Sequence, residues 1–148
     1  MSQPAPPQIF DRGLINRRLD RAWARARGGG VQADFLLARA AEDLRDRLSL
    51  VKRRFALGAD FGSPGPYGAA ALAAGGQVDC VIRIAPTEAS LGNGDFLPAV
   101  GDLERLPVAD GRLDLAVSLL ALQTVNDLPG ALLQIRRARA PRRDRGAD

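Results

Sequence analysis

The sequence contains no histidine, a single cysteine (Cys80) and only 5% aromatic residues. Without histidine, the chain cannot build a Ser-His-Asp triad, a histidine general base or a histidine metal site. One cysteine excludes an intrachain disulfide and a cysteine-cluster metal site. The longest apolar run, residues 113–122, is interrupted by Asp114 and Ser118 and is too short to span a bilayer. We therefore expect a reduced, soluble, cytoplasmic protein without a metal site.

Lysine is also nearly absent, because Lys52 is the only lysine among 21 basic residues. The net charge of +4 is distributed unevenly: residues 1–54 carry +6, residues 55–135 carry −6, and residues 136–148 carry +4. Arginine can bind phosphate, but aromatic residues do not alternate with the basic ones as they do in single-strand binders. An arginine-driven nucleic-acid binder is therefore a minor alternative.

The 148 residues suffice for one domain, and a hydrophobic fraction of 46% can form a core. Residues 1–8 are expected to form a flexible lead-in, and residues 9–54 an N-terminal helical segment. Apolar residues at helical spacing predict one helix over residues 9–27, which ends at three glycines, and a second from Asp34 to about Val51. Both helices are expected to pack on a sheet by one face. For residues 12–27 the alternative is a basic amphipathic helix that lies on an anionic membrane, although Asp20 interrupts its positive charge.

The periodicity changes after residue 54 to that of alternating strands and helices. Strands are predicted over residues 55–61, 78–84, 99–100 and 113–120, and helices over residues 69–74 and 128–139. The last strand is almost continuously apolar, which is typical of a parallel strand covered on both faces. The alternation predicts an α/β fold with a Rossmann-like, doubly wound parallel sheet over residues 55–138. Residues 139–148 are basic, and we expect a disordered tail there.

A glycine-rich turn joins the first strand to the following helix. Asp60 lies near the end of the strand, and the sequence GSPGPYG follows over residues 62–68. Backbone N–H groups of such a turn, together with a helix N-terminus, can hold an anionic group. A tight strand-to-helix connection is the alternative. Gly101 and Asp102 follow the predicted third strand, which would bring a carboxylate to the same sheet edge.

At this point several stretches resemble the class I S-adenosylmethionine-dependent methyltransferases. They are IFDRGLINRRLDRAWAR, FLLARAAEDLRDRLSLVKRRF, ADFGSPG and GDLERLPVADGRLDLAVSLLALQTVNDLPGALLQIRRA, which together cover most of residues 9–138. Within that family the chain resembles the subgroup of a mitochondrial complex I assembly factor, which is similar to the malonyl-acyl-carrier methyltransferase. The resemblance implies a seven-stranded fold and S-adenosylmethionine as cofactor.

The resemblance also implies roles for individual residues. The loop beside the methionine end of the cofactor would comprise Asp60, Gly62, Ser63 and Gly65. Asp102 would accept a hydrogen bond from the adenine amine, and Leu103 would pack on the adenine ring. No catalytic residue is assigned, because positioning supplies most of the rate in such a site.

Four departures from the family pattern stand out. Pro64 and Pro66 replace turn glycines and remove N–H donors. The acidic residue that would hold the ribose after the second strand is absent, and Glu88 is the nearest carboxylate. Gln123-Thr124 replaces a His-Trp pair. Finally, the resemblance stops near Ala138, so we expect a truncated or out-of-frame terminus of a longer gene, with residues 113–120 left as an open sheet edge. A naturally short domain with a basic tail is the alternative.

The sequence thus predicts a methyltransferase acting on an unidentified acceptor, which could be a small molecule, an acyl carrier or a protein. The alternative is a non-catalytic remnant or an assembly-factor-like interaction protein, and the subgroup also admits a protein-modifying hydroxylase. Asn126 and Asp127 precede Leu128-Pro129 as a helix N-terminus would, with Asp127 as the cap. Substrate contact is the second interpretation of this pair.

Overall fold

The structure is a computed structural model that describes residues 4–5, 7–29 and 34–140. Its elements follow in the order α1 (Arg12–Arg27), α2 (Phe35–Ser49), β1 (Phe55–Phe61), α3 (Tyr67–Ala74), β2 (Val78–Ala85), α4 (Glu88–Leu91), β3 (Leu97–Val100), β4 (Leu115–Val117), the 3-10 helix η1 (Leu122–Thr124) and α5 (Leu128–Ala138). Residues 141–148 of the predicted tail (139–148) and residues 1–3 and 6 of the predicted lead-in (1–8) lie outside the described residues. Among the described residues, no helix is both long and apolar enough to cross a membrane.

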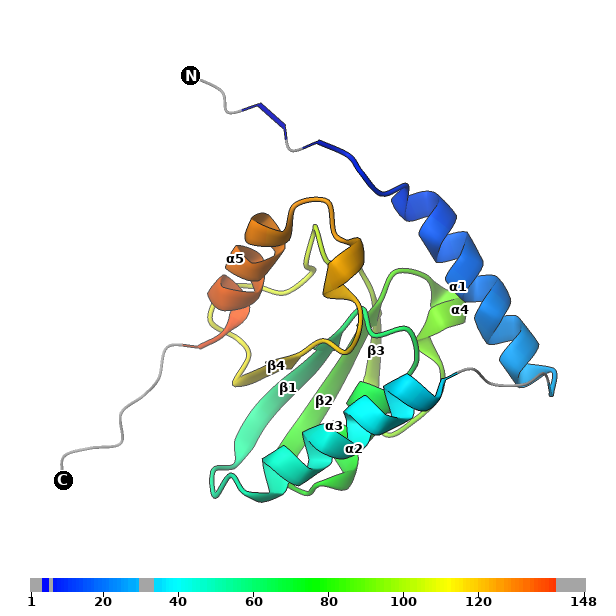
Figure 1. Ribbon diagram of the computed structural model, residues 1–148. Helices are drawn as coiled ribbons and strands as arrows, with labels where there is room; N and C mark the ends of the chain where they lie inside the picture. Colours follow the sequence, from blue (N-terminus) through cyan, green and yellow to red (C-terminus); the bar gives the residue numbers. More distant parts are fainter. Residues whose placement is uncertain (1–3, 6, 30–33, 141–148) are drawn as a thin grey trace.

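The four strands form one parallel sheet in the order β3-β2-β1-β4, which confirms the predicted α/β, Rossmann-like class (Figure 1). The chain moves outward from β1 to β3 on one side and then returns to place β4 on the other side of β1. The strand order therefore reverses between β1 and β4. In open α/β sheets, ligands bind outside the carboxyl ends of the strands at such a reversal.

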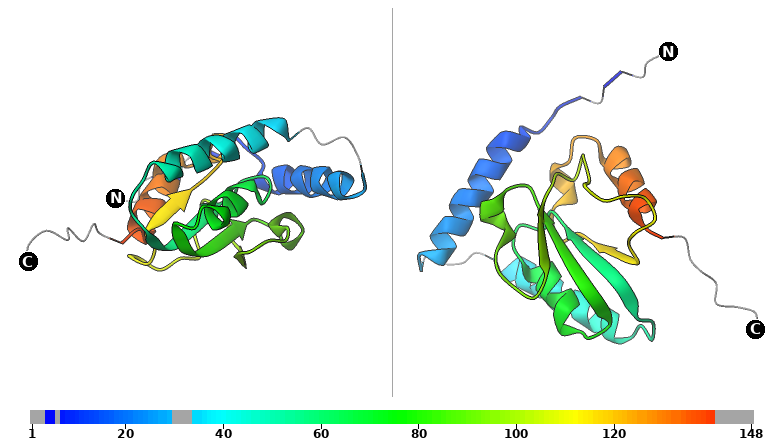
Figure 2. Two further views of the ribbon diagram at one scale, coloured as in Figure 1. Left: turned by 90° about the horizontal axis from the view of Figure 1, so that it is seen from below. Right: turned by 180° about the vertical axis from the view of Figure 1, so that it is seen from behind.

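Two apolar layers enclose the sheet, one on each face. On one face, α2 and α3 contribute Leu48, Ala69 and Leu72, which pack with Phe55, Val78 and Val81 of the strands. On the other face, Phe61 and Ile84 pack with buried residues that follow β3 and β4 and with Ala131 and Ala138 of α5. The two views of Figure 2 show α1 apart from both layers, lying beside α4 near one end of the strands.

The strand over residues 113–120 is shorter than the sequence predicts, and this prediction was wrong in extent. Only Leu115–Val117 pairs with β1, and these residues are half-buried rather than fully covered. The polar residues at its two ends explain the difference. Asp114 Oδ2 accepts hydrogen bonds from the backbone of Ala56 and Leu57 at 2.9 and 3.1 Å, and Ser118 Oγ donates to Phe61 O at 2.7 Å. At Asp114 these side-chain bonds accompany one backbone bond, from Asp114 N to Leu57 O at 2.9 Å, and at Ser118 the hydroxyl makes the bond to β1.

The outer edge of β4 is not open along its whole length. Leu113 forms a parallel bridge with Arg139, and Ala140 N donates to Leu113 O at 2.7 Å. The first two residues of the expected tail thus lie beside the entry into β4. The predicted cap of α5 is confirmed, because the Asp127 side chain accepts from Gly130 N at 2.9 Å.

Candidate functional site

The glycine turn after β1 is organised around a fully buried ion pair. Asp60 and Arg83 expose none of their side-chain surface, and Arg83 Nη1 lies 3.0 Å from Asp60 Oδ2. The same carboxylate accepts a bond from the Ser63 hydroxyl and another from Ala69 N, at 3.1 Å, in the first turn of α3. Asp60 therefore holds the turn and the start of α3 from inside the fold.

The guanidinium of Arg83 connects this turn to α4. Nη2 donates to Ser63 O at 3.0 Å and to Ser90 O at 2.7 Å, and Nε donates to Leu91 O at 2.7 Å. With the bond to Asp60, one side chain satisfies three backbone carbonyls and a carboxylate. A buried arginine of this kind fixes the relative positions of the groups that it joins.

Burial dominates the electrostatics of the pair. Dehydration raises the pKa of Asp60 above its ordinary value of 3.8, because the bonds from Ser63, Arg83 and Ala69 offset only part of the cost of burying the charge. Burial likewise lowers the pKa of Arg83, and the charge of Asp60 opposes that shift. Both shifts follow from enclosure within the fold rather than from an open cleft.

Gly62 occupies a conformation that favours glycine. Its φ is +66°, and a Cβ at this position would lie 2.9 Å from Leu103 Cδ1. Backbone strain and lack of space therefore both require the missing side chain. Gly62 N donates to Ile84 O at 2.8 Å, which joins the turn to the end of β2.

A cavity of about 180 Å³ opens at the carboxyl ends of the strands. Its walls come from the segments that follow all four strands and from α1, including Gly62 after β1, Pro86 after β2, Gly101 and Leu103 after β3, Leu120 and Thr124 after β4, and Arg12 and Asn16 of α1. Leu120 is the only non-glycine among the described residues with a positive φ, 53°. Strained backbone of this kind gathers at functional sites.

The six residues predicted to bind cofactor are distributed unequally about this cavity. Gly62 and Leu103 line it, and Leu103 is 4% exposed. Asp60 and Ser63 lie buried behind the turn, and Gly65 lies close to the rings of Tyr67 and Trp23. Asp102 follows the cavity-lining Gly101 and is paired with Arg12. Two of the six predicted residues, Gly62 and Leu103, therefore line the cavity, and the other four do not.

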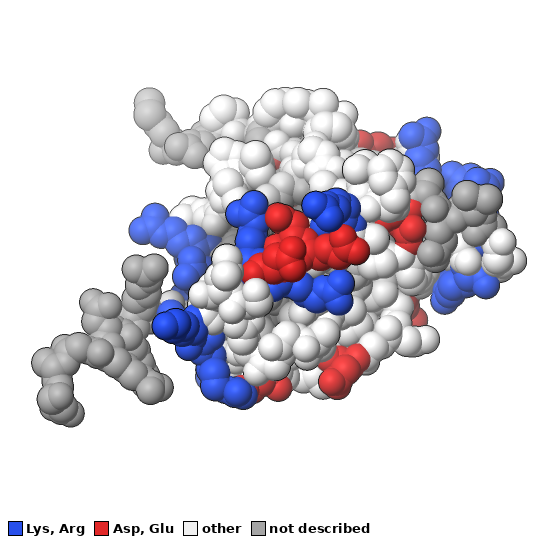
Figure 3. All heavy atoms as spheres, turned by 60° about the horizontal axis from the view of Figure 1, so that its bottom comes forward, with Lys and Arg blue, Asp and Glu red and all other residues white. Residues whose placement is uncertain are grey.

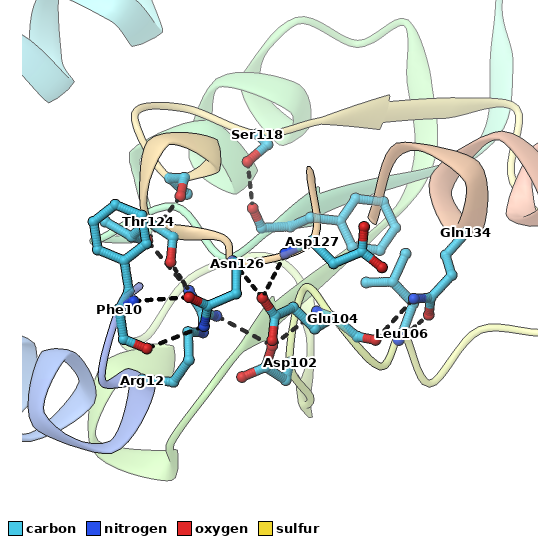
Figure 4. A network of polar contacts seen from close by, with 12 residues as sticks. Phe10, Arg12, Asp102, Glu104, Leu106, Ser118, Thr124, Asn126, Asp127 and Gln134 are labelled. Atoms are coloured by element: carbon cyan, nitrogen blue, oxygen red, sulfur yellow. Dashed lines mark hydrogen bonds and ion pairs between the residues drawn. The ribbon is translucent and has the colours of Figure 1, made fainter. Parts of the chain in front are cut away.

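Asp102 belongs to a polar network that reaches α1 (Figure 4). Arg12 Nη2 donates to Asp102 Oδ1 at 3.1 Å, and Arg12 Nη1 donates to Thr124 O and Oγ1 at 3.1 and 3.2 Å. Glu104 N donates to the same Asp102 Oδ1, at 2.8 Å, so Oδ2 keeps its acceptor capacity. Arg12 Nε is buried without a hydrogen-bond partner among the described residues.

Asn126 fixes the chain that leads into α1. Its Oδ1 accepts from Ile9 N and Phe10 N at 2.8 and 2.7 Å, and its Nδ2 donates to Phe10 O at 3.0 Å. Asn126 therefore has a structural role: its side chain binds a segment that lies more than a hundred residues away in the sequence. Sequence analysis missed Arg12 and Asn16 as cavity residues. The only signal for Arg12 was its place in the IFDR stretch.

The end of β2 presents no carboxylate to the cavity. Ile84 and Ala85 are buried, Pro86 lines the cavity, and Glu88 is exposed in the first turn of α4. Glu88 therefore does not take the place of the missing acidic residue.

Comparisons with known proteins agree with this architecture. Residues 62–142 match the family model described as methyltransferase domain. The chain is 34% identical over 142 residues to a protein of Mus musculus named arginine-hydroxylase NDUFAF5, mitochondrial, and 32% identical over 141 residues to its counterpart in Danio rerio. These alignments cover 90% of this chain but only 40% and 42% of the two relatives. The chain thus spans about two fifths of their length.

Solved structures show the same fold. An S-adenosylmethionine-dependent methyltransferase of Thermotoga maritima superposes with a TM-score of 0.62 at 19% identity, covering 85% of this chain and 57% of that one. The [4+2]-cyclase SpnF superposes with a TM-score of 0.64 at 14% identity, covering 99% of this chain and 67% of the cyclase. At these identities the likeness concerns the fold alone.

Proposed function

Because the chain belongs to the S-adenosylmethionine-dependent methyltransferase family, we propose that it binds this cofactor in the cavity at the carboxyl ends of the strands and transfers its methyl group to an acceptor. The observation that supports this most strongly is the place of the cavity, where the strand order reverses between β1 and β4. The glycine turn, the Gly101 backbone before Asp102 and α1 all line that cavity.

The residues present fit the cofactor in chemistry. Gly62 leaves the backbone of the turn bare beside the cavity, and Leu103 supplies an apolar wall suited to a purine. Arg12 and Glu104 N bind Asp102 Oδ1, and the hydrogen bonds of the described residues include none to Oδ2, so this oxygen, at the border of the cavity, could accept from the adenine amine. The volume of about 180 Å³ is smaller than the roughly 300–1,000 Å³ of most ligand sites. The bound cofactor would therefore extend beyond the cavity or displace α1 slightly.

Asp60 and Ser63 act indirectly in this proposal. Asp60 shapes the turn through Ala69 N and Arg83, and Ser63 Oγ accepts from Leu119 N at 2.9 Å, which links the turn to the chain after β4. Both residues would position the methionine end of the site without touching it.

S-adenosylmethionine supplies an activated methyl group on a sulfonium centre when bound. The described residues that line the cavity include no carboxylate, and their only charged side chain is that of Arg12. No lining group is suited to remove a proton from the acceptor. The protein would therefore act by aligning an acceptor that is already nucleophilic and by excluding water, which can supply much of the rate.

Calorimetric titration with S-adenosylmethionine and with S-adenosylhomocysteine tests the proposal. We expect saturable binding by the wild-type chain and a loss of at least tenfold in Gly62→Ala, because the added Cβ meets Leu103 beside the cavity. Gly76→Ala is the matched control, since Gly76 has nearly the same φ, +67°, but open space around its Cβ position. A wild-type dissociation constant weaker than about 1 mM, or about −4 kcal/mol, would contradict the proposal.

The acceptor is proposed only by class: a small molecule, an acyl carrier or a protein. A cytoplasmic location likewise stays a prediction. Nucleic acid is disfavoured by the face shown in Figure 3, where basic and acidic side chains adjoin one another. Arg53 with Asp114 and Arg47 with Asp43 are ion pairs at 4.0 and 2.8 Å, so such arginines do not form a continuous basic surface.

A further inference from the structure

Helix α1 crosses the carboxyl edge of the sheet and is attached at two points two turns apart. Near its start, Arg12 binds Asp102 after β3 and Thr124 after β4. Further along, Asp20 Oδ1 accepts a hydrogen bond at 2.5 Å from the Thr87 hydroxyl, which follows β2. Residues 12, 16 and 20 are spaced by four, so they lie along one face of the helix. The middle position of that face is Asn16.

Asn16 differs from its two neighbours on this face. Its side chain lines the cavity together with Pro86, and it is half-buried. The hydrogen bonds of the described residues include none made by the Asn16 carboxamide, although Arg12 and Asp20 are both engaged. A polar group that lines a cavity between two attached residues, and that has no partner among the residues the structure describes, is placed for a ligand.

The cavity needs such a group at this place. In dinucleotide-type sites, a carboxylate after the second strand holds the ribose hydroxyls. Here that position is apolar, through Ile84, Ala85 and Pro86, and Glu88 is exposed elsewhere. A ribose lying against Pro86 would find no polar group from β2.

We infer that Asn16 is the residue that binds the ribose hydroxyls of the cofactor, a role supplied from α1 instead of the sheet. This inference rests on the proposed function. The carboxamide oxygen accepts from one hydroxyl of the vicinal pair, and the amide NH₂ donates to the oxygen of the other. The Asp20–Thr87 bond attaches α1, one turn beyond Asn16, to the segment after β2, so Asp20 is a positioning residue for Asn16.

The test compares two ligands on matched variants. S-adenosylhomocysteine and its 2′,3′-dideoxy analogue are titrated into the wild type, Asn16→Leu, Asn16→Asp and the control Asn93→Leu, which changes an exposed asparagine in the loop after α4. For the wild type we expect the dideoxy analogue to bind about tenfold more weakly, as the loss of one or two hydrogen bonds predicts. Asn16→Leu should weaken S-adenosylhomocysteine by about the same factor and discriminate between the ligands by less than twofold.

Asn16→Asp should retain both the affinity and the discrimination, because a carboxylate can accept from both hydroxyls. Asn93→Leu should behave as the wild type. Equal discrimination in the wild type and Asn16→Leu would overturn the inference, as would a wild type that binds both ligands equally. If Asn16→Leu does not fold, as judged by circular dichroism, Asn16→Asp and the wild-type ligand pair decide the matter. Failure of the wild type to bind S-adenosylhomocysteine at all would instead refute the proposed function.

Discussion

Replacing Arg83 by methionine should destabilise the fold severely. The substitution keeps an unbranched apolar stem but removes a guanidinium with no exposed surface. Asp60 then remains buried without its partner, and Ser63 O, Ser90 O and Leu91 O lose a donor. Removing one partner of a buried ion pair costs about 3–5 kcal/mol. That is a large share of the roughly 5–15 kcal/mol by which domains are stable.

A second substitution separates the charge from the packing. In Asp60→Asn the carboxamide oxygen can still accept from Ala69 N, and the NH₂ that replaces the other oxygen can donate to the Ser63 hydroxyl, while the buried negative charge is removed. The double variant Arg83→Met, Asp60→Asn should therefore be about 1–3 kcal/mol more stable than Arg83→Met alone, since no uncompensated charge remains.

Urea unfolding provides the measurement, followed by far-ultraviolet circular dichroism and by the fluorescence of the single tryptophan, Trp23, which lies close to Gly65 of the turn. The reasoning is refuted if Arg83→Met loses less than about 1 kcal/mol, or if the double variant is no more stable than the single one. Arg83→Lys serves where Arg83→Met does not fold. The lysine ammonium keeps the positive charge but cannot make all four hydrogen bonds of the guanidinium, so the loss of unfolding free energy should be smaller than in Arg83→Met.

Three further outcomes follow from the same contacts. From about pH 3.8 to the raised pKa of Asp60, the folded state keeps a proton that the unfolded state releases, so wild-type stability should fall as pH rises. The urea midpoint of Asp60→Asn should lack this fall with pH. If the wild-type midpoint instead rises relative to that of Asp60→Asn over this range, the pKa of Asp60 is not raised in the folded state. Asn126→Ala should cost about 1–2 kcal/mol and speed amide exchange at Phe10, whereas unchanged exchange would show that Asn126 does not hold that segment. In thermal melts, Gly62→Ala should lose about 1–3 kcal/mol more unfolding free energy than Gly76→Ala, because the added Cβ meets Leu103. Equal losses would mean that Leu103 moves away at no cost.

The sequence predicts an element well where its bounds depend only on residues nearby in the chain. The strand at residues 55–61 is predicted correctly because the turn residues that follow it end the strand, and β2 departs by one residue. The strand at residues 113–120 is overestimated because Asp114 and Ser118 form their bonds with β1 backbone that is about 57 residues away. Such bonds have no local signal.

The candidate site divides in the same way. Glycines 62 and 101 and Leu103 are visible from turn chemistry and from the resemblance, and all three line the cavity. Arg83 is visible as a charge inside an apolar strand, but its partner depends on the register that sets it opposite Asp60. Asn16 is one polar residue on an arginine-rich helix, and only the crossing of α1 over the strand ends distinguishes it from its neighbours.

The two prolines of the turn explain why Arg83 matters to this site. The backbone N–H groups of a glycine turn stabilise it and can bind a ligand. Pro64 and Pro66 have no N–H group, and Gly62 N already donates to Ile84 O. The turn therefore depends on bonds to its other groups, namely the Arg83 bond to Ser63 O and the Ser63 hydroxyl bond to Asp60. The turn therefore offers fewer N–H donors to a ligand, which agrees with the proposal that Asn16 of α1 takes part in binding.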